Sequence, residues 1–229
     1  VSMAESRRAE VPNFTGGEAA SITAQGNPYV FRTSFGQSSS FPKLARYINA
    51  KAKTLAVIYV NNDFGKGGRD AMAKNLEGTA TKIVADISTD SGQVDFSAAV
   101  LKAKQSNADA VFVYTNEEES ARALRELRKQ GWTKPIIGET TLTGQKVIEL
   151  AGEAANGAVA HVGLTVDAPL PAVRAFPAVL GPTPRVDADL EAVTGDGRQI
   201  TLSRLQVDHL HRQLTYTITL SRLKKKEKI

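Results

Sequence analysis

The segment Lys53–Met72, with the sequence KTLAVIYVNNDFGKGGRDAM, constrains the fold of this 229-residue chain more than any other segment. Its apolar, β-branched run Leu55–Val60 is too short for most helices and predicts a strand buried on both faces. Asn61–Gly68 interrupts the apolar pattern as a predicted loop, and helical spacing resumes at Arg69. This order of strand, loop and helix is typical of α/β proteins, in which ligands bind at the carboxyl ends of the strands.

The same alternation continues along the chain and predicts an α/β fold with a doubly wound parallel sheet, because parallel strands need crossovers that cover both faces. The clearest helix is Glu117–Gln130, with acidic residues in its first turn, basic residues in its last and one apolar face. The other predicted helices are one capped by Ser38–Ser40 that buries Phe41, Leu44, Ala45 and Ile48, then Arg69–Leu76, Phe96–Ala103 capped by Asp95, and Gln145–Ala151. The predicted strands are Val11–Phe14, Tyr29–Phe31, Leu55–Val60, Ile83–Ile87, Ala108–Tyr114, Pro135–Ile137 and Ala158–Val162.

The composition is that of an ordinary globular protein, with 41% hydrophobic and 23% charged residues. The sequence contains no apolar run near the ~18 residues of a membrane span, and its first residues, VSMAESRRAE, do not have the regions of a signal peptide. Without cysteine the chain has no disulfide and no thiolate ligand or nucleophile. Its three histidines do not stand in metal-ligand spacing with a carboxylate, so we expect no metal and no cofactor.

The net charge of +5 is confined to the end of the chain. From Arg204 onward seven basic residues stand against two acidic ones, and the preceding residues are neutral overall. A basic run at a terminus is more often a solvated tail than a nucleic-acid site, so we expect no nucleic-acid partner. The strand and helix pattern also ends after Phe176, although Ile200–Leu205 and Leu214–Leu220 could form strands.

Motifs of enzyme chemistry are missing from the sequence. The glycines of Gly65–Gly68 match neither the dinucleotide fingerprint nor the phosphate-binding loop. The triplet Asp63-Phe64-Gly65 occurs without the other kinase motifs, and the nucleophile motif Gly-x-Ser-x-Gly is absent. His161 lies in a predicted strand, where a packed residue is expected more often than a catalyst. The sequence therefore predicts that the protein is not an enzyme.

Polar residues follow three of the predicted strands, in the loops Asn61–Gly67, Thr115–Glu117 and Glu139–Thr141. In a doubly wound sheet the carboxyl ends of the strands lie along one edge, so these loops can converge on one small molecule. For any single loop the alternative is ordinary turn and capping chemistry, which uses the same residue types. Three such loops on one edge favour a binding site.

The order of these segments resembles the periplasmic binding proteins of type I fold, most closely the receptors for branched-chain amino acids and amides that feed ABC importers. The resemblance covers Val11 to Phe176 and rests on the segments NPYVFRTS, TLAVIYVNNDFGKGG, VDFSAAVLKAKQSNADAVFVYTNEEESARALRELRKQGW and PIIGETTLTGQKVIELAGEAANGAVA. It implies a solute-binding receptor that grips a small ligand, an amino acid, an amide or a related carboxylate, between two lobes. The alternative with the same fold is a ligand-sensing regulatory domain, and an α/β enzyme is a third.

The resemblance also implies a domain organisation. Residues 1–34 would be a fragment of the first lobe and residues 35–176 the second lobe, so that the fold is one lobe with a partial second lobe. Residues 177–229 form an atypical tail without assignment. The opening strands of the first lobe would lie outside the chain, so we expect weak binding at most from this chain. The implied location is the periplasm and the implied partner a membrane permease.

The binding residues of the family carry over unevenly. By resemblance, the loop Thr15, Gly16, Gly17 and Glu18 would hold the carboxylate and the ammonium group of the ligand. Phe64 stands where many members place a tyrosine over the ligand, and Asn116 and Glu117 stand at a second contact that is often aromatic. Thr140 stands where the branched-chain receptors use an acid for the ammonium group. Glu18, Glu117 or Glu139 could replace that acid, and the sequence does not choose among them.

Overall fold

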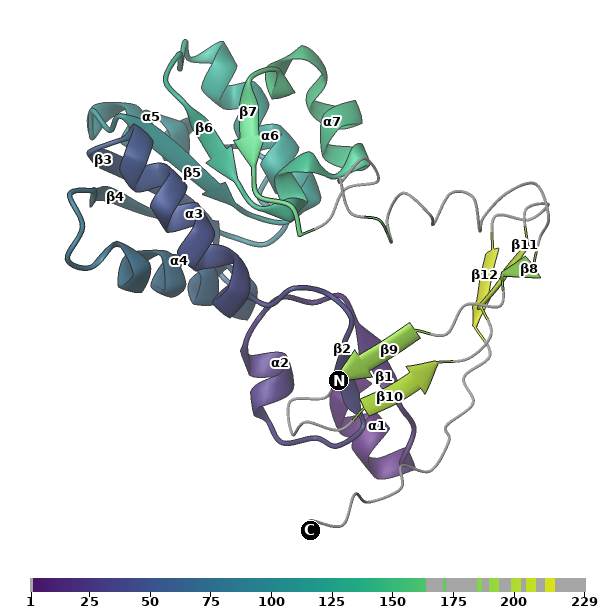
Figure 1. Cartoon of the computed structure of the whole chain (residues 1–229). Coiled ribbons are helices and arrows are strands. Elements are labelled where there is room, and N and C mark those ends of the chain that lie inside the picture. The colour runs from purple at the N-terminus through teal and green to yellow at the C-terminus, as the bar shows by residue number, and fades with distance from the viewer. Residues whose placement is uncertain are drawn as a thin grey trace. The chain divides into compact units, whose positions relative to one another are not determined.

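The computed structural model describes residues 2–163, Pro171 and the backbone of five short strands between residues 185 and 216. The chain divides into two compact units, Val1–Gly163 and Leu164–Ile229. The first unit contains the elements of the α/β pattern (Figure 1). Its helices are α1 (Ser2–Ala9), α2 (Ser21–Ala24), α3 (Gln37–Lys51), α4 (Asp63–Leu76), α5 (Ser97–Gln105), α6 (Glu117–Lys129) and α7 (Gln145–Ala151), with 3-10 turns η1 (Thr140–Thr143) and η2 (Gly152–Ala155).

A five-stranded sheet forms the centre of the first unit. Its strands lie in the order β4-β3-β5-β6-β7, and every neighbouring pair is parallel. The predicted parallel α/β sheet is therefore confirmed, with strand boundaries that differ by a few residues from those predicted. The strands are β3 (Thr54–Val60), β4 (Lys82–Thr89), β5 (Ala110–Tyr114), β6 (Ile136–Gly138) and β7 (Ala158–Ala160).

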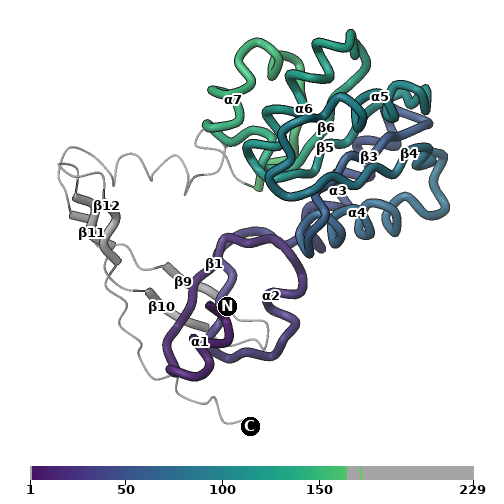
Figure 2. The backbone as a smooth tube through the Cα atoms, turned by 180° about the vertical axis from the view of Figure 1, so that it is seen from behind, coloured from purple at the N-terminus to yellow at the C-terminus, as the bar shows by residue number. Residues whose placement is uncertain are grey.

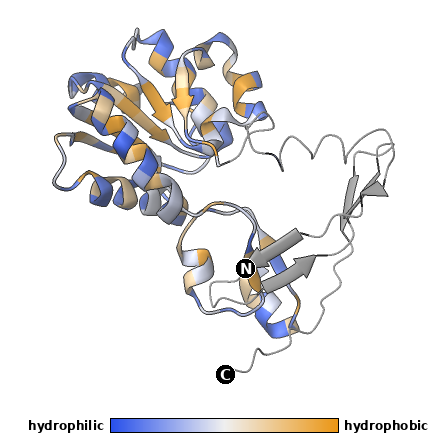
Figure 3. Cartoon of the chain, in the orientation of Figure 1, coloured by the Kyte–Doolittle hydropathy of each residue, from blue (hydrophilic) through white to orange (hydrophobic). Residues whose placement is uncertain are grey.

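Helices cover both faces of this sheet, and each face has its own apolar core. Leu55 and Val57 of β3 pack with the buried residues of α3 and α4, whereas Ala56 and Ile58 pack with those of α5, α6 and α7. Alternate residues of one strand thus reach opposite cores, as a strand buried on both faces requires. Figure 3 shows the strands of the sheet as an apolar layer between helices whose outer faces are hydrophilic.

The residues before α3 form a second, smaller sheet within the same unit. Strands β1 (Asn13–Thr15) and β2 (Val30–Arg32) pair in parallel, and α2 connects them. The rings of Phe14 and Phe31 stack across the pair at 5.3 Å. Figure 2 shows this segment in purple, leading through β2 into α3. The two predicted strands are therefore present, shifted by one or two residues.

Helix α4 begins at Asp63, six residues before the predicted start at Arg69, so the predicted loop Asn61–Gly68 is largely wrong. The side chain of Asn62 caps the helix by accepting a hydrogen bond from the backbone N–H of Gly65 at 2.9 Å. A Cβ atom at Gly65 would lie 1.8 Å from the carbonyl oxygen of Val60. The glycines that suggest a loop in sequence instead let the first turns of a helix press against the end of β3.

The starts of α3 and α5 also differ from those predicted. Helix α3 begins at Gln37 and has Gly36 at its N-cap without a side-chain hydrogen bond, so Ser38–Ser40 lie inside the first turns rather than capping them. The predicted apolar face of α3 is buried as expected. Helix α5 begins one residue after Phe96, and the carboxylate of Asp95 accepts the hydrogen bond of the Ser97 N–H at 2.8 Å.

Successive strands are added first on one side of β3 and then on the other, so the strand order reverses between β3 and β5. The chain leaves β3 through α4 to reach β4 on one side, and it returns through α5 to reach β5 on the other side of β3. The connections therefore cross opposite faces of the sheet, and the loops after β3 and β5 diverge. This is the position at which open α/β sheets bind ligands.

The second unit contains only antiparallel strand pairs in its described residues. Strand β9 pairs with β10, and β11 pairs with both β8 and β12. The predicted strand Ile200–Leu205 corresponds to two strands, and the predicted Leu214–Leu220 overlaps one, while the basic residues from Arg222 onward lie outside the described residues. The strands are β8 (Arg185–Val186), β9 (Leu190–Val193), β10 (Gln199–Leu202), β11 (Leu205–Asp208) and β12 (Gln213–Tyr216).

Within the described residues, none of the helices combines the length and the apolar character that crossing a membrane demands.

We expect Gly65→Ala to lower the free energy of unfolding by about 2 kcal/mol. Forcing a methyl group against the backbone of β3 costs about 3 kcal/mol, the upper end of the usual cost of overpacking a core. The better helix propensity of alanine offsets about 1 kcal/mol of this cost. Gly67→Ala in the same helix is the matched control, because its Cβ would meet only the side-chain end of Gln37, at 2.8 Å. Urea unfolding of both variants measures the difference; equal stabilities would contradict the close packing.

Candidate functional site

A cavity of about 390 Å³ lies at the carboxyl ends of β3 and β5, where the strand order reverses. Four parts of the chain form its walls: the segment from the loop after β1 into α2, the first turn of α4, the start of α6 and the turn η1 after β6. This position agrees with the predicted convergence of the strand-end loops. The lining residues are Gly16, Gly17, Glu18, Ala19, Ile22, Phe64, Asn116, Glu117 and Thr141.

Most of the residues proposed from sequence lie in this lining, and two do not. Thr15 supports the loop from behind, since its Oγ1 accepts a hydrogen bond from the backbone N–H of Gly17 at 3.0 Å. Thr140 is exposed and its hydroxyl donates to the carboxylate of Glu139 at 3.0 Å, so its neighbour Thr141 faces the cavity instead. The binding residues named one by one from sequence did not include Ala19, Ile22 or Thr141, although Thr141 belongs to the predicted loop Glu139–Thr141.

The apolar wall of the cavity is the ring of Phe64. This ring stacks on the ring of Tyr114, with centroids 4.2 Å apart and planes 26° apart. The position of Tyr114 is fixed in turn, because it is 1% exposed and its ring also meets Phe41 edge-on at 5.3 Å. Phe64 therefore offers one face to the cavity while the other rests on the core.

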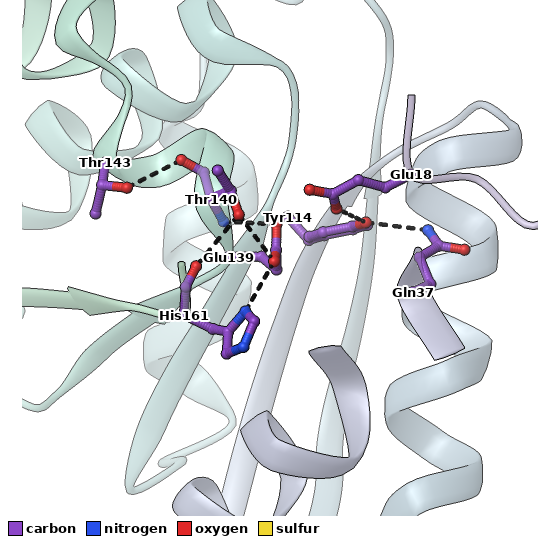
Figure 4. A network of polar contacts seen from close by, with 7 residues as sticks. All are labelled: Glu18, Gln37, Tyr114, Glu139, Thr140, Thr143 and His161. Carbon is purple, nitrogen blue, oxygen red and sulfur yellow. Dashed lines mark hydrogen bonds and ion pairs between the residues drawn. The ribbon is translucent and has the colours of Figure 1, made fainter. Parts of the chain in front are cut away.

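A chain of hydrogen bonds runs from Gln37 through Tyr114 to Glu18 (Figure 4). The amide nitrogen of Gln37 donates to the hydroxyl of Tyr114 at 3.0 Å, and that hydroxyl donates to Oε2 of Glu18 at 3.3 Å. Because an amide NH₂ can only donate, the hydroxyl proton of Tyr114 is directed toward Glu18. The same amide nitrogen also donates to the carbonyl of Phe64 at 2.8 Å, which ties the start of α3 to the apolar wall.

Glu139 lies beneath the cavity and is 1% exposed. Its Oε2 accepts a hydrogen bond from the backbone N–H of Thr140 at 2.5 Å, and its Oε1 accepts one from the Thr140 hydroxyl. Nδ1 of His161 lies 3.1 Å from the same Oε1 (Figure 4). Both oxygens are therefore occupied by partners from the first residue of η1 and the residue after β7. His161 packs against this carboxylate from just beyond β7, whereas the sequence placed it inside a strand.

Burial, followed by a hydrogen bond to the neighbouring carboxyl of Glu139 and the charge of that group, raises the pKa of the Glu18 carboxyl to about 8. The hydroxyl of Tyr114 and the guanidinium of Arg32 act in the opposite direction by stabilising the carboxylate. Burial also raises the pKa of Tyr114. Glu18 is thus a carboxyl group that keeps its proton at neutral pH while it faces the cavity.

Asn116 is held in place by the first turn of α6. Its side-chain amide donates to Oε1 of Glu119 at 2.9 Å, and the backbone N–H of Gly92 donates to the same oxygen at 2.7 Å. Burial acts to raise the pKa of Glu119, but these donors outweigh it and the pKa is lowered. Glu119 therefore stays ionised beside the positive end of the helix. Glu117, one residue after Asn116, is exposed at the rim of the cavity.

In the part of the chain that the structure describes, no three side chains of His, Asp or Glu come together in a way that could hold a metal ion. The cavity offers instead an aromatic face, small backbone-exposing residues and carboxyl groups. Such a lining suits the enclosure of a small organic molecule by shape, hydrogen bonds and charge.

The family of periplasmic binding proteins matches this chain over residues 4–183. The chain belongs to this family. It is a family of substrate-binding proteins and not of enzymes. Among curated relatives, a Leu/Ile/Val-binding protein of Citrobacter freundii is 28% identical over 141 residues, which are 61% of this chain and 38% of that protein. A Leu/Ile/Val/Thr-binding protein of Salmonella typhimurium is 29% identical over 61% of this chain and 39% of its own length.

Solved structures establish the same fold. A leucine binding protein from Thermotoga maritima superposes with a TM-score of 0.68 at 24% identity, covering 78% of this chain and 52% of that one. A branched-chain amino acid ABC transporter protein from Thermus thermophilus with bound valine gives a TM-score of 0.63 at 21% identity, over 75% of this chain and 46% of that one. The chain thus spans about two fifths of the curated relatives it matches and about half of these structures.

We expect two substitutions to move the pKa of Glu18 in opposite directions. Glu139→Gln removes a neighbouring negative charge, so the pKa should fall from about 8 toward the ordinary value for a glutamate. Tyr114→Phe removes the hydroxyl that stabilises the carboxylate, so the pKa should rise. Titration of the side-chain carboxyl carbon by NMR measures both. A pKa that stays constant in both variants would mean that Glu18 is exposed to solvent.

Proposed function

We propose that this chain is part of a solute-binding receptor of an ABC importer and that it binds an amino acid, an amide or a related small molecule in the cavity at the ends of β3 and β5. The names of the curated relatives, which bind leucine, isoleucine and valine, support this ligand class. The observation that carries the proposal is the cavity itself. It is formed by residues from the segment after β1 and from the segments that follow the parallel strands β3, β5 and β6, at the reversal of strand order.

Different parts of the lining would provide the apolar and the polar contacts to a ligand. The face of Phe64 and the side chain of Ile22 provide apolar contact for a hydrocarbon side chain. Gly16 lacks a side chain, and a Cβ atom at this position would meet nothing within 4 Å, so its backbone is open to a ligand. Asn116, Glu117 and Glu18 provide polar contacts. Together with Thr15, which accepts a hydrogen bond from the backbone of Gly17, and Thr140, which precedes the lining residue Thr141, these residues form the proposed site.

A solute-binding receptor of an importer has a membrane partner and a cellular location. Binding would present the ligand-bound receptor to a membrane permease, and the protein would act in the periplasm without catalysing a reaction. These statements follow from membership in the family and extend to the whole receptor, of which this chain matches a part.

The test is a titration of ¹⁵N-labelled protein with single amino acids and amides, followed by NMR. We expect L-leucine to shift the amide signals of Gly16, Gly17, Phe64 and Asn116 selectively, with a dissociation constant in the millimolar range because an open site buries only part of a ligand. Unchanged spectra with every amino acid and amide tested would reject the proposal.

Phe64→Ala should weaken the binding of L-leucine by about tenfold or more, since burying an aromatic side chain against a ligand contributes roughly 1.5–3 kcal/mol. Phe35→Ala is the matched control, because Phe35 is an exposed phenylalanine outside the cavity lining. Equal losses in both variants would show that the apolar wall is elsewhere.

A further inference from the structure

We propose that Glu18 is a proton-operated latch between two parts of the first unit. It holds the N-terminal segment (residues 2–34, with α1, β1, α2 and β2) against the five-stranded sheet while its carboxyl group is protonated, and it releases the segment when the proton is lost. This conformational switch does not depend on which ligand the cavity takes. Three observations support it: the few contacts that join the two parts, the carboxyl pair at their junction and the charges around that pair.

The N-terminal segment has few connections to the rest of the first unit. Among the described residues, neither of the two apolar cores contains a side chain from this segment. Two hydrogen bonds join it to later residues in the part of the chain that the structure describes, and Glu18 makes both. Its carbonyl oxygen accepts from the backbone N–H of Gln37 at 3.3 Å, and its Oε2 accepts from the hydroxyl of Tyr114 at 3.3 Å. Glu18 is therefore the residue through which the segment docks.

The side chain of Glu18 ends beside a second carboxyl group, that of Glu139 (Figure 4). Glu139 is almost fully buried, and both of its oxygens accept hydrogen bonds from Thr140, so its position is fixed. A protonated Glu18 can donate a hydrogen bond to Glu139. An ionised Glu18 would instead place two like charges close together in a partly dry place, which is unfavourable. The proton of Glu18 thus decides whether the junction attracts or repels.

Release of the N-terminal segment would remove this repulsion without leaving Glu18 unpaired. Arg32 lies in β2 of the same segment and stabilises the carboxylate of Glu18. Its guanidinium is tied to the segment, since it donates to the carbonyl of Ala19 at 2.6 Å. Arg32 therefore moves with Glu18, whereas Glu139 stays with the sheet. An ionised Glu18 would keep its counter-charge in both states and would meet the like charge only in the docked state.

The charged and titratable groups around Glu18 come from several elements. The hydroxyl of Tyr114 and the guanidinium of Arg32 favour the carboxylate, and burial and Glu139 oppose it. His161 contacts Glu139, and Glu117 is exposed at the rim of the cavity, where water screens its charge. The groups are Tyr114 of β5, Arg32 of β2, Glu139 before η1, His161 after β7 and Glu117 at the start of α6.

The direction of the pH dependence follows from the pKa of Glu18. In the docked state this pKa is raised from 4.5 to about 8, chiefly by burial and then by Glu139. In the released state the carboxyl group is exposed to water and keeps the ordinary value. Docking is therefore most favourable below pH 4.5, and it weakens by about tenfold for each unit as the pH rises toward 8.

Docking of the N-terminal segment also completes the cavity. The segment supplies Gly16, Gly17, Glu18, Ala19 and Ile22 to the lining, and the remaining lining residues belong to the part that carries the five-stranded sheet. A rise in pH therefore opens the cavity on the side of β1, and a fall in pH closes it there.

Hydrogen exchange of the Gln37 amide in the full chain tests the latch. This N–H donates to the carbonyl oxygen of Glu18 and is buried, so it exchanges when the segment is released. After correction for the intrinsic exchange rate, its protection factor should fall about 70-fold between pH 5.5 and pH 7.5, as a change in pKa from 4.5 to about 8 requires. It should also stay below that of the Phe112 amide in β5, because the sheet remains folded on release.

Glu18→Gln keeps the shape of the side chain but has no proton to lose, so the protection factor of Gln37 should become the same at both pH values. Glu77→Gln removes an exposed carboxylate at the end of α4 and is the matched control, which should retain the 70-fold change. If Glu18→Gln does not fold, Glu139→Gln provides the second test. It removes the like charge and lowers the pKa of Glu18, so the change should become smaller.

Three results would overturn the latch. A pH dependence that Glu18→Gln leaves in place would assign it to another group. Equal protection of Gln37 and Phe112 would mean that Glu18 stabilises the whole fold rather than one junction. A protection factor near one at both pH values would mean that the segment does not dock. These measurements need no ligand, so they leave the test of the receptor function separate.

Discussion

The buried side chain of Tyr114 is the contact on which both the sheet and the cavity depend. Its ring packs between Phe41 of α3 and Phe64 of α4, and its hydroxyl accepts a hydrogen bond from Gln37 and donates one to Glu18. One residue at the end of β5 thus joins two helices, the apolar wall of the cavity and the loop after β1. Because the hydroxyl is desolvated, the loss of either partner would leave one of its two hydrogen bonds unmade in the core.

Strand order explains why this contact lies at a cavity rather than inside a continuous core. The chain crosses one face of the sheet between β3 and β4 and the opposite face between β4 and β5, so the helices that follow β3 and β5 leave in different directions. The space between them stays open at the carboxyl ends. The loop carrying Gly16, Gly17 and Glu18 covers this opening from the side of β1. A small set of residues therefore meets there without disturbing the packing below.

Hydrophobic pattern alone was sufficient to predict the parallel sheet, its crossovers and the helix α7, because short buried strands and one-sided helices have distinct periods. The start of α4 could not be predicted in this way. Gly65 and Gly68 signal a loop by composition, and only the coordinates reveal that a Cβ at Gly68 would lie 2.0 Å from the ring of Tyr114. Local propensity was overridden by tertiary packing at this point.

The candidate site was predictable to a similar extent. The three strand-end loops and the glycine loop could be named from sequence, and each of them contributes at least one residue to the lining of one cavity. The orientation of adjacent residues could not, since a single turn decides that Thr141 faces the cavity while Thr140 binds Glu139. The hydrogen bonds that link Gln37, Tyr114 and Glu18 could not be predicted either, because these residues are far apart in sequence and share no motif.

That separation has a consequence for how the molecule folds. The hydrogen bond between Tyr114 and Glu18 joins residues 96 positions apart. Closing so long a loop costs entropy that a single hydrogen bond cannot repay, so the contact must wait until neighbouring strands have brought the two segments together. The wall that holds Glu18 is therefore expected to be among the last parts of the molecule to assemble and among the first to open when the native state fluctuates.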